Sequence, residues 1–97
     1  MATRQRPQPN RVFVDMSVLF SASHSPRGAA RDLVVAGVVG DVDLIISLFV
    51  VVETRRNLSL KASSALPYFE ALLGRGVFRL VEPPATLVHR VAGMIVP

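Results

Sequence analysis

The sequence predicts an α/β fold in which a parallel sheet is flanked by helices. Short segments of β-branched and aliphatic residues alternate with segments whose apolar residues recur at helical spacing. The expected element order is β–α–α–β–α–α–β–α. Strands that are separated by helices are typical of parallel sheets.

The expected elements follow from spacing and from turn residues. We expect a flexible tail over 1–10, where polar residues and prolines dominate, and one domain over 11–97. The expected strands are 11–14, 44–46 and 77–81. The expected helices are 18–22 with Ser17 as N-cap, 29–38, the segment 63–76 with Gly74 as C-cap, and 84–93.

The segment from Ser47 to Lys61 is ambiguous from its residues alone. Its β-branched residues favour a strand. Ser47 is nevertheless a good N-cap, and Leu48, Val51 and Val52 fall on one face of a helix. Both alternatives remain open on this evidence.

Composition narrows the class of protein. Hydrophobic residues make up 51% of the 97 residues, enough for the core of one small domain. The absence of cysteine excludes a disulfide scaffold and a thiolate zinc site. The net charge of +4 does not by itself indicate nucleic-acid binding. The clean apolar run 44–52 is far shorter than the ~20 residues of a membrane span, so we expect a cytoplasmic protein without a membrane partner.

Asp15 is the first candidate site residue. It follows the apolar run Val12-Phe13-Val14, and a second apolar run begins at Val18. A carboxylate between two core-forming runs needs water, a hydrogen-bond donor or a metal. Ligands of parallel α/β sheets bind beyond the carboxyl ends of the strands, which is where Asp15 is expected. The alternative is that Asp15 only caps the helix after it.

Glu53 is the second candidate. If its segment is helical, Glu53 lies in the second turn, near the same strand ends as Asp15. Two carboxylates about 5 Å apart repel by roughly 3 kcal/mol at a dielectric constant near 20, and a divalent cation removes that repulsion. Oxygen ligands of this kind suit Mg²⁺ or Mn²⁺. The alternative is a surface pair of Glu53 with Arg56 or Asn57 at helical spacing.

Two stretches, "RVFVDMSVLFSASHSPRGAARDLV" and "DLIISLFVVVETRRNL", resemble the N-terminal part of a PIN domain. The likeness is greatest to bacterial toxin components of toxin–antitoxin pairs. The Asp-x-Asn/Ser/Thr motif of that family matches Asp15 to Ser17, and its helical Glu matches Glu53. The resemblance implies a PIN-like sheet flanked by helices, with a helix over about 48–60.

The resemblance also implies a function: a Mg²⁺- or Mn²⁺-dependent ribonuclease that acts on RNA and pairs with an antitoxin. Asp15 and Glu53 would bind the metal, and Ser17 would hydrogen-bond Asp15 or a metal-bound water. In that family further acids follow, whereas this chain has none after Glu82. We therefore expect a C-terminally truncated domain with an open edge on its first strand, and hence a homo-oligomer. The alternative function is an inactive PIN remnant that acts only in self-association or partner binding.

Overall fold

The computed structural model describes residues 9–82, and their element order is the predicted one up to the third strand. The strands are β1 (Asn10–Phe13), β2 (Val42–Ser47) and β3 (Phe78–Val81). The helices are α1 (Met16–His24), α2 (Ala29–Val38), α3 (Leu48–Lys61), the short 3-10 helix η1 (Ser63–Ala65) and α4 (Leu66–Gly74). None of these helices is both long and apolar enough to cross a membrane. Most of the expected tail and the helix expected over 84–93 lie outside the described residues.

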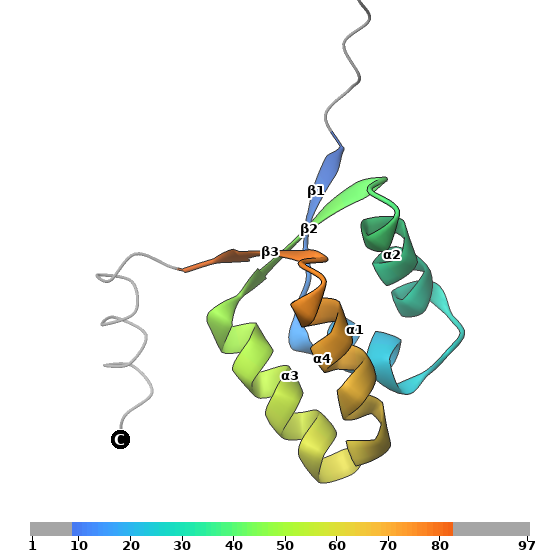
Figure 1. The fold of residues 1–97 in the computed structure, drawn as a ribbon, viewed down its shortest axis with the longest axis vertical. Coiled ribbons are helices and arrows are strands. Elements are labelled where there is room, and N and C mark those ends of the chain that lie inside the picture. The colour runs from blue at the N-terminus through green and yellow to red at the C-terminus, as the bar shows by residue number, and fades with distance from the viewer. Residues whose placement is uncertain (1–8, 83–97) are drawn as a thin grey trace, which may run out of the picture.

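The three strands form a parallel sheet with β2 in the centre, between β1 and β3. Each connection from one strand to the next contains two α-helices. The prediction of an α/β fold with a parallel sheet is therefore confirmed. All three strands run in the same direction, so their carboxyl ends lie together at one end of the sheet (Figure 1).

One face of the sheet carries the core. The four α-helices pack against this face and lie together on one side of the strands (Figure 1). The sheet supplies Val14, Leu44, Ile46 and Phe78 to the core. The helices supply Leu19, Ala22, Val34, Val51, Leu58, Phe69 and Leu72. The largest fully buried side chains include Phe69, Leu19 and Leu44. These three form the centre of the packing.

On the opposite face the described strands bury one hydrophobic side chain, Ile45. The strand register pairs Phe13 with Ile45 and Ile45 with Arg79, so these three side chains point the same way. Phe13 is 75% exposed there, although Ile45 is buried. Arg79 contacts Asp43 at 2.9 Å on this face, but Arg79 is largely exposed, so the pair contributes only about 0–1 kcal/mol.

The ambiguous segment is the helix α3, as the resemblance implies. Its N-cap is Ser47, as predicted, whose Oγ accepts a hydrogen bond from the Val50 amide at 3.1 Å. The predicted apolar face is only partly right. Val51 is buried, whereas Leu48 and Val52 are about half exposed, because α3 turns only one side towards α1 and α4.

Two predicted helix caps are wrong, and the first strand is shifted. Asp15, not Ser17, is the N-cap of α1, because the Asp15 carboxylate reaches the Val18 amide and the helix can start at Met16. β1 accordingly lies one residue earlier than predicted. At the end of α4, Gly74 is still helical, and Gly76 adopts the positive φ of 69° that ends the turn.

Gly37 allows α2 to approach the sheet. A Cβ at this position would lie 2.8 Å from Leu44 Cγ and closer still to Leu44 Cδ1, whereas a Cβ at Gly74, the last residue of α4, would meet nothing within 4 Å. Gly37→Ala is expected to lower the free energy of unfolding by about 1–3 kcal/mol through overpacking. Gly74→Ala is the matched control and is expected to raise that free energy by about 0.5–1 kcal/mol. Urea unfolding measures both, and the same sign for both variants would contradict the prediction.

Candidate functional site

Asp15 lies at the carboxyl end of β1 in the exposed position that the sequence predicts. The backbone is extended at Asp15, which turns its carboxylate back over the first turn of α1. Oδ1 accepts two hydrogen bonds, one from the Ser17 hydroxyl at 2.8 Å and one from the Val18 amide at 3.1 Å. Asp15 therefore has the capping role that was considered as the alternative, and its side chain is held in one orientation by its own motif.

These bonds keep Asp15 ionised. The Val18 amide first and the Ser17 hydroxyl second hold the pKa of Asp15 below its usual value, because both donors favour the charged form. A lowered folded-state pKa stabilises the fold above the unfolded-state pKa, and this contribution is lost as the pH falls through the folded-state value. At neutral pH the strand end therefore carries an oriented negative charge.

A depression of ≈ 460 Å³ opens at this edge of the sheet. All three strands contribute to it. Its lining consists of Phe13, Val14, Asp15, Ile45, Ile46, Ser47, Val50, Val81 and Glu82. Two of these residues are carboxylates, Asp15 after β1 and Glu82 after β3. Glu82 was not predicted as a site residue, although its position directly after a strand is the same signal that indicated Asp15.

A second, smaller hollow of ≈ 200 Å³ lies between α1 and α3. Met16, Ser17, Phe20, Asn57 and Lys61 line it. Ser17 lines this smaller hollow, and its hydroxyl donates a hydrogen bond to the Asp15 carboxylate, which lines the larger depression. Ser17 therefore lies between the two hollows.

Glu53 lies in the second turn of α3 and is half-buried. It does not line the depression that contains Asp15. Asn57, one turn further along, donates a hydrogen bond to the Glu53 backbone carbonyl at 2.8 Å and lines the smaller hollow together with Ser17. Glu53 and Asn57 are four residues apart, so both lie on the side of α3 that faces the start of α1. The close approach of Glu53 and Asp15 stays a prediction.

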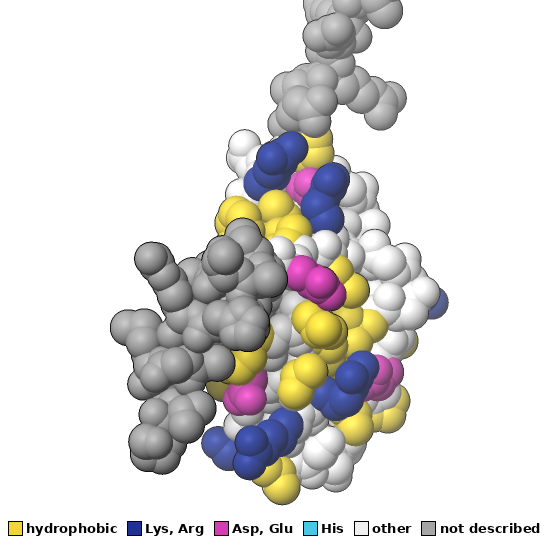
Figure 2. All heavy atoms as spheres, turned by 90° about the vertical axis from the view of Figure 1, so that its left-hand side faces the viewer, with side chains coloured by type: hydrophobic (Ala, Val, Ile, Leu, Met, Phe, Trp, Pro, Cys, Tyr) yellow, Lys and Arg dark blue, Asp and Glu magenta, His cyan; other side chains and the backbone are white. Residues whose placement is uncertain are grey.

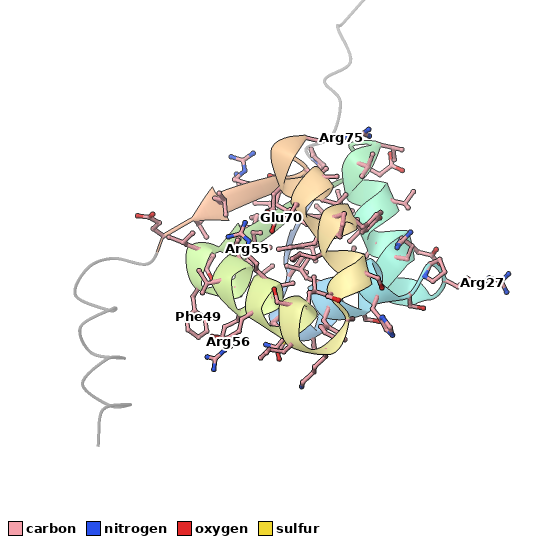
Figure 3. The ribbon with its side chains drawn as sticks, turned by 60° about the horizontal axis from the view of Figure 1, so that its bottom comes forward. Arg27, Phe49, Arg55, Arg56, Glu70 and Arg75 are labelled. Carbon is pink, nitrogen blue, oxygen red and sulfur yellow. The ribbon has the colours of Figure 1, made fainter. Side chains whose placement is uncertain are left out.

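Arg55 and Glu70 form a structural pair outside the site. Arg55 Nε and Nη2 donate to the two carboxylate oxygens of Glu70 at 2.6 and 2.8 Å, which joins α3 to α4 (Figure 3). The bidentate bond raises the pKa of Arg55 and lowers the pKa of Glu70. Figure 3 shows Arg56 pointing outward from α3 beside Phe49. Both arginines are exposed, but Arg55 is bound to Glu70, whereas Arg56 makes no ion pair within the described residues.

The side chains that could ligate a metal are therefore oxygen donors at the strand ends. Within residues 9–82 there is no group of three or more His, Asp or Glu side chains that could hold a metal ion. Two carboxylates line the depression, those of Asp15 after β1 and Glu82 after β3, on opposite sides of the central strand β2. Carboxylate oxygens of this kind suit Mg²⁺ or Mn²⁺, and Mg²⁺ often binds through one or two carboxylates and keeps several waters.

No protein-family model, curated protein or solved structure matches this chain. What the site can do is consequently argued from its geometry and from the motif around Asp15.

Proposed function

We propose that the chain is a PIN-type domain that acts as a Mg²⁺- or Mn²⁺-dependent ribonuclease, as toxin component of a toxin–antitoxin pair. The observation that carries this proposal is the Asp15 carboxylate, which is exposed at the carboxyl end of β1 with the Ser17 hydroxyl bound to it. This is the bond that the resemblance assigns to the Asp-x-Ser motif. The position agrees with the rule that parallel α/β sheets bind ligands at this edge.

Asp15 would ligate the metal, with Glu53 as second acid by resemblance. Ser17 would hold the Asp15 carboxylate in its orientation. Glu82 shares the depression with Asp15 and is a further oxygen donor there. A bound Mg²⁺ or Mn²⁺ would activate a water for attack on a phosphodiester and neutralise the negative charge that develops on phosphate. The chain itself supplies the oriented carboxylate and, through the hollow at Ser17, space next to it.

The RNA backbone would lie along the smaller hollow and the exposed side of α3. Lys61 lines that hollow, and Arg56 is exposed on the same helix, so both cations are accessible to phosphates. An antitoxin is the protein partner that the proposal implies. Because β1 is an edge strand of the described sheet, its backbone is also available for pairing with a second copy of the chain.

A second candidate function is an inactive remnant that only binds a partner or itself. The observation that favours it is the exposure of large apolar side chains. Phe13 on the sheet and Phe49 on α3 are 75% and 69% exposed. Exposed aromatic side chains of this kind are typical of surfaces that contact another protein.

The test of the proposal is cleavage of an end-labelled, single-stranded RNA by the purified chain with Mn²⁺, with Mg²⁺ and with excess EDTA. We expect cleavage with either metal, its loss in EDTA, and its return when metal is added back. Circular dichroism run in parallel shows whether the protein is folded under each condition. A folded protein that does not cleave RNA with either metal would contradict the proposal. It would favour the second candidate function, an inactive remnant that only binds a partner or itself.

A further inference from the structure

The smaller hollow between α1 and α3 has the composition of a site for a flat ring with polar edges. Its volume of ≈ 200 Å³ is below the roughly 300–1,000 Å³ of pockets for drug-sized ligands, so it suits one ring system better than a whole nucleotide. Met16 and Phe20 supply apolar surface, and Ser17, Asn57 and Lys61 supply polar groups. None of these lining residues is acidic, so the hollow tolerates a ligand that carries phosphate better than the larger depression with its two carboxylates does.

Phe20 is the aromatic surface of this hollow. It is half-buried and packs against the core, so the position of its ring is fixed by the fold. One turn further along α1, the His24 ring lies 5.8 Å from the Phe20 ring, measured between centroids, at an angle of 40°. The two rings form a short aromatic row of which Phe20 lies in the hollow. Bases of single-stranded RNA stack on such rings, because every base has a flat π face.

Asn57 is the group in the hollow that can distinguish one base from another. Its Nδ2 donates a hydrogen bond to the Glu53 carbonyl at 2.8 Å, which orients the amide. Within residues 9–82, no further hydrogen bond engages the second Nδ2 proton or the Oδ1 oxygen. An asparagine amide with one donor and one acceptor matches N7 and the N6 amino group of adenine together, whereas guanine presents two acceptors at the same edge.

The two ends of the hollow are suited to the neighbouring phosphates. Lys61 ends α3 and is exposed there. Figure 2 shows a group of Lys and Arg side chains at the lower end of the molecule, where α3 ends in Figure 1. Ser17 lines the hollow and binds the Asp15 carboxylate at 2.8 Å. A base in the hollow would therefore belong to a nucleotide that lies between these cations and the proposed metal ligand.

We propose that the hollow binds one adenine base of single-stranded RNA, stacked on Phe20 and hydrogen-bonded to Asn57, with Lys61 near a flanking phosphate. The inference rests on the proposed function, because it gives the RNA of that function a preferred base beside the bond that is cleaved. Base binding nevertheless needs no metal, since neither Phe20 nor Asn57 is a proposed metal ligand. It can consequently be measured in EDTA, where cleavage does not occur.

Fluorescence anisotropy of end-labelled RNA with the full chain in EDTA tests the base site. The probes are short oligouridylates with a single central adenosine, cytidine or guanosine. Asn57→Ala removes the amide from the hollow. Asn10→Ala is the matched control, since Asn10 is the other asparagine of the chain and is exposed at the start of β1. Phe20→Leu removes the aromatic face, and Phe20→Tyr retains it. Circular dichroism shows whether each variant is folded.

We expect the unmodified chain and Asn10→Ala to bind the adenosine probe about ten times more tightly than the other two, because a bidentate contact discriminates between bases to this degree. Asn57→Ala should bind all three probes equally. Phe20→Leu should weaken binding of every probe about fivefold or more, whereas Phe20→Tyr should stay close to the unmodified chain, because both rings offer a face for stacking.

Equal affinity of the folded chain for the three probes would overturn the proposal, as would the absence of binding to any of them. An adenine preference that survives Asn57→Ala, or equal affinities of Phe20→Leu and Phe20→Tyr, would also overturn it. Cleavage with Mn²⁺ and no adenine preference in EDTA would remove the base site and leave the proposed ribonuclease. An adenine preference in a folded chain that does not cleave would do the opposite.

Discussion

Under the proposed function, the Asp15→Asn variant is expected to lower RNA cleavage by at least about 100-fold, because substitutions around a metal's ligands commonly cost 10- to 100-fold and this one would remove the charge of the proposed ligand. The fold should persist. Asn is as good an N-cap as Asp, so its side-chain oxygen can still accept from the Val18 amide that Asp15 now binds at 3.1 Å. Cleavage rates with Mn²⁺, and urea unfolding of the same preparation, measure the two effects separately.

Asp32→Asn is the matched control for this variant. It makes the same chemical change at an exposed carboxylate in the first turn of α2. Its cleavage rate and its stability should stay close to those of the unmodified chain. If Asp15→Asn cleaves as fast as Asp32→Asn, the Asp15 carboxylate serves only as a helix cap. If Asp15→Asn unfolds, Asp15→Ser repeats the test with another good N-cap.

Phe69→Ala is expected to lower the free energy of unfolding by about 3–5 kcal/mol, since the change removes a buried ring and leaves a cavity. Phe69 is fully buried on α4 and is the largest side chain buried to this degree. A loss of this size is a large part of the roughly 5–15 kcal/mol that stabilises a typical domain. The midpoint of urea unfolding should fall steeply, and the variant should be partly unfolded on mild warming.

Phe49→Ala is the same substitution on the surface. Phe49 is 69% exposed on α3 and points away from the core (Figure 3). Its truncation should change the free energy of unfolding by no more than about 0.5 kcal/mol. If Phe69→Ala and Phe49→Ala lowered the free energy of unfolding by the same amount, Phe69 would not be a central residue of the core. A loss in Phe49→Ala alone would mean that another surface covers this ring.

Local features of the chain were predictable because they depend on neighbours in the sequence. Ser47 could be recognised as an N-cap from its side chain and the residues after it, and the structure confirms the bond to Val50. The parallel sheet followed from strands that alternate with helices. Phe69 and Leu72 lie three residues apart on α4, and both are buried. Residues three or four apart lie on the same face of a helix, independently of the rest of the fold.

Features that depend on how elements pack were not predictable to the same degree. Leu48 and Val52 have the spacing of a core face, yet they are about half exposed, because the neighbours of α3 cover only its other side. Glu82 shares a depression with Asp15, which lies 67 residues earlier in the chain, only because β3 lies in the same parallel sheet as β1. The sequence by itself determined the order of the elements, the Ser47 cap and the Asp15 motif, since these are set by contacts within a few residues. Only the tertiary structure decided which face of the sheet the helices pack against and which strand ends line the same depression, since both depend on contacts between distant segments.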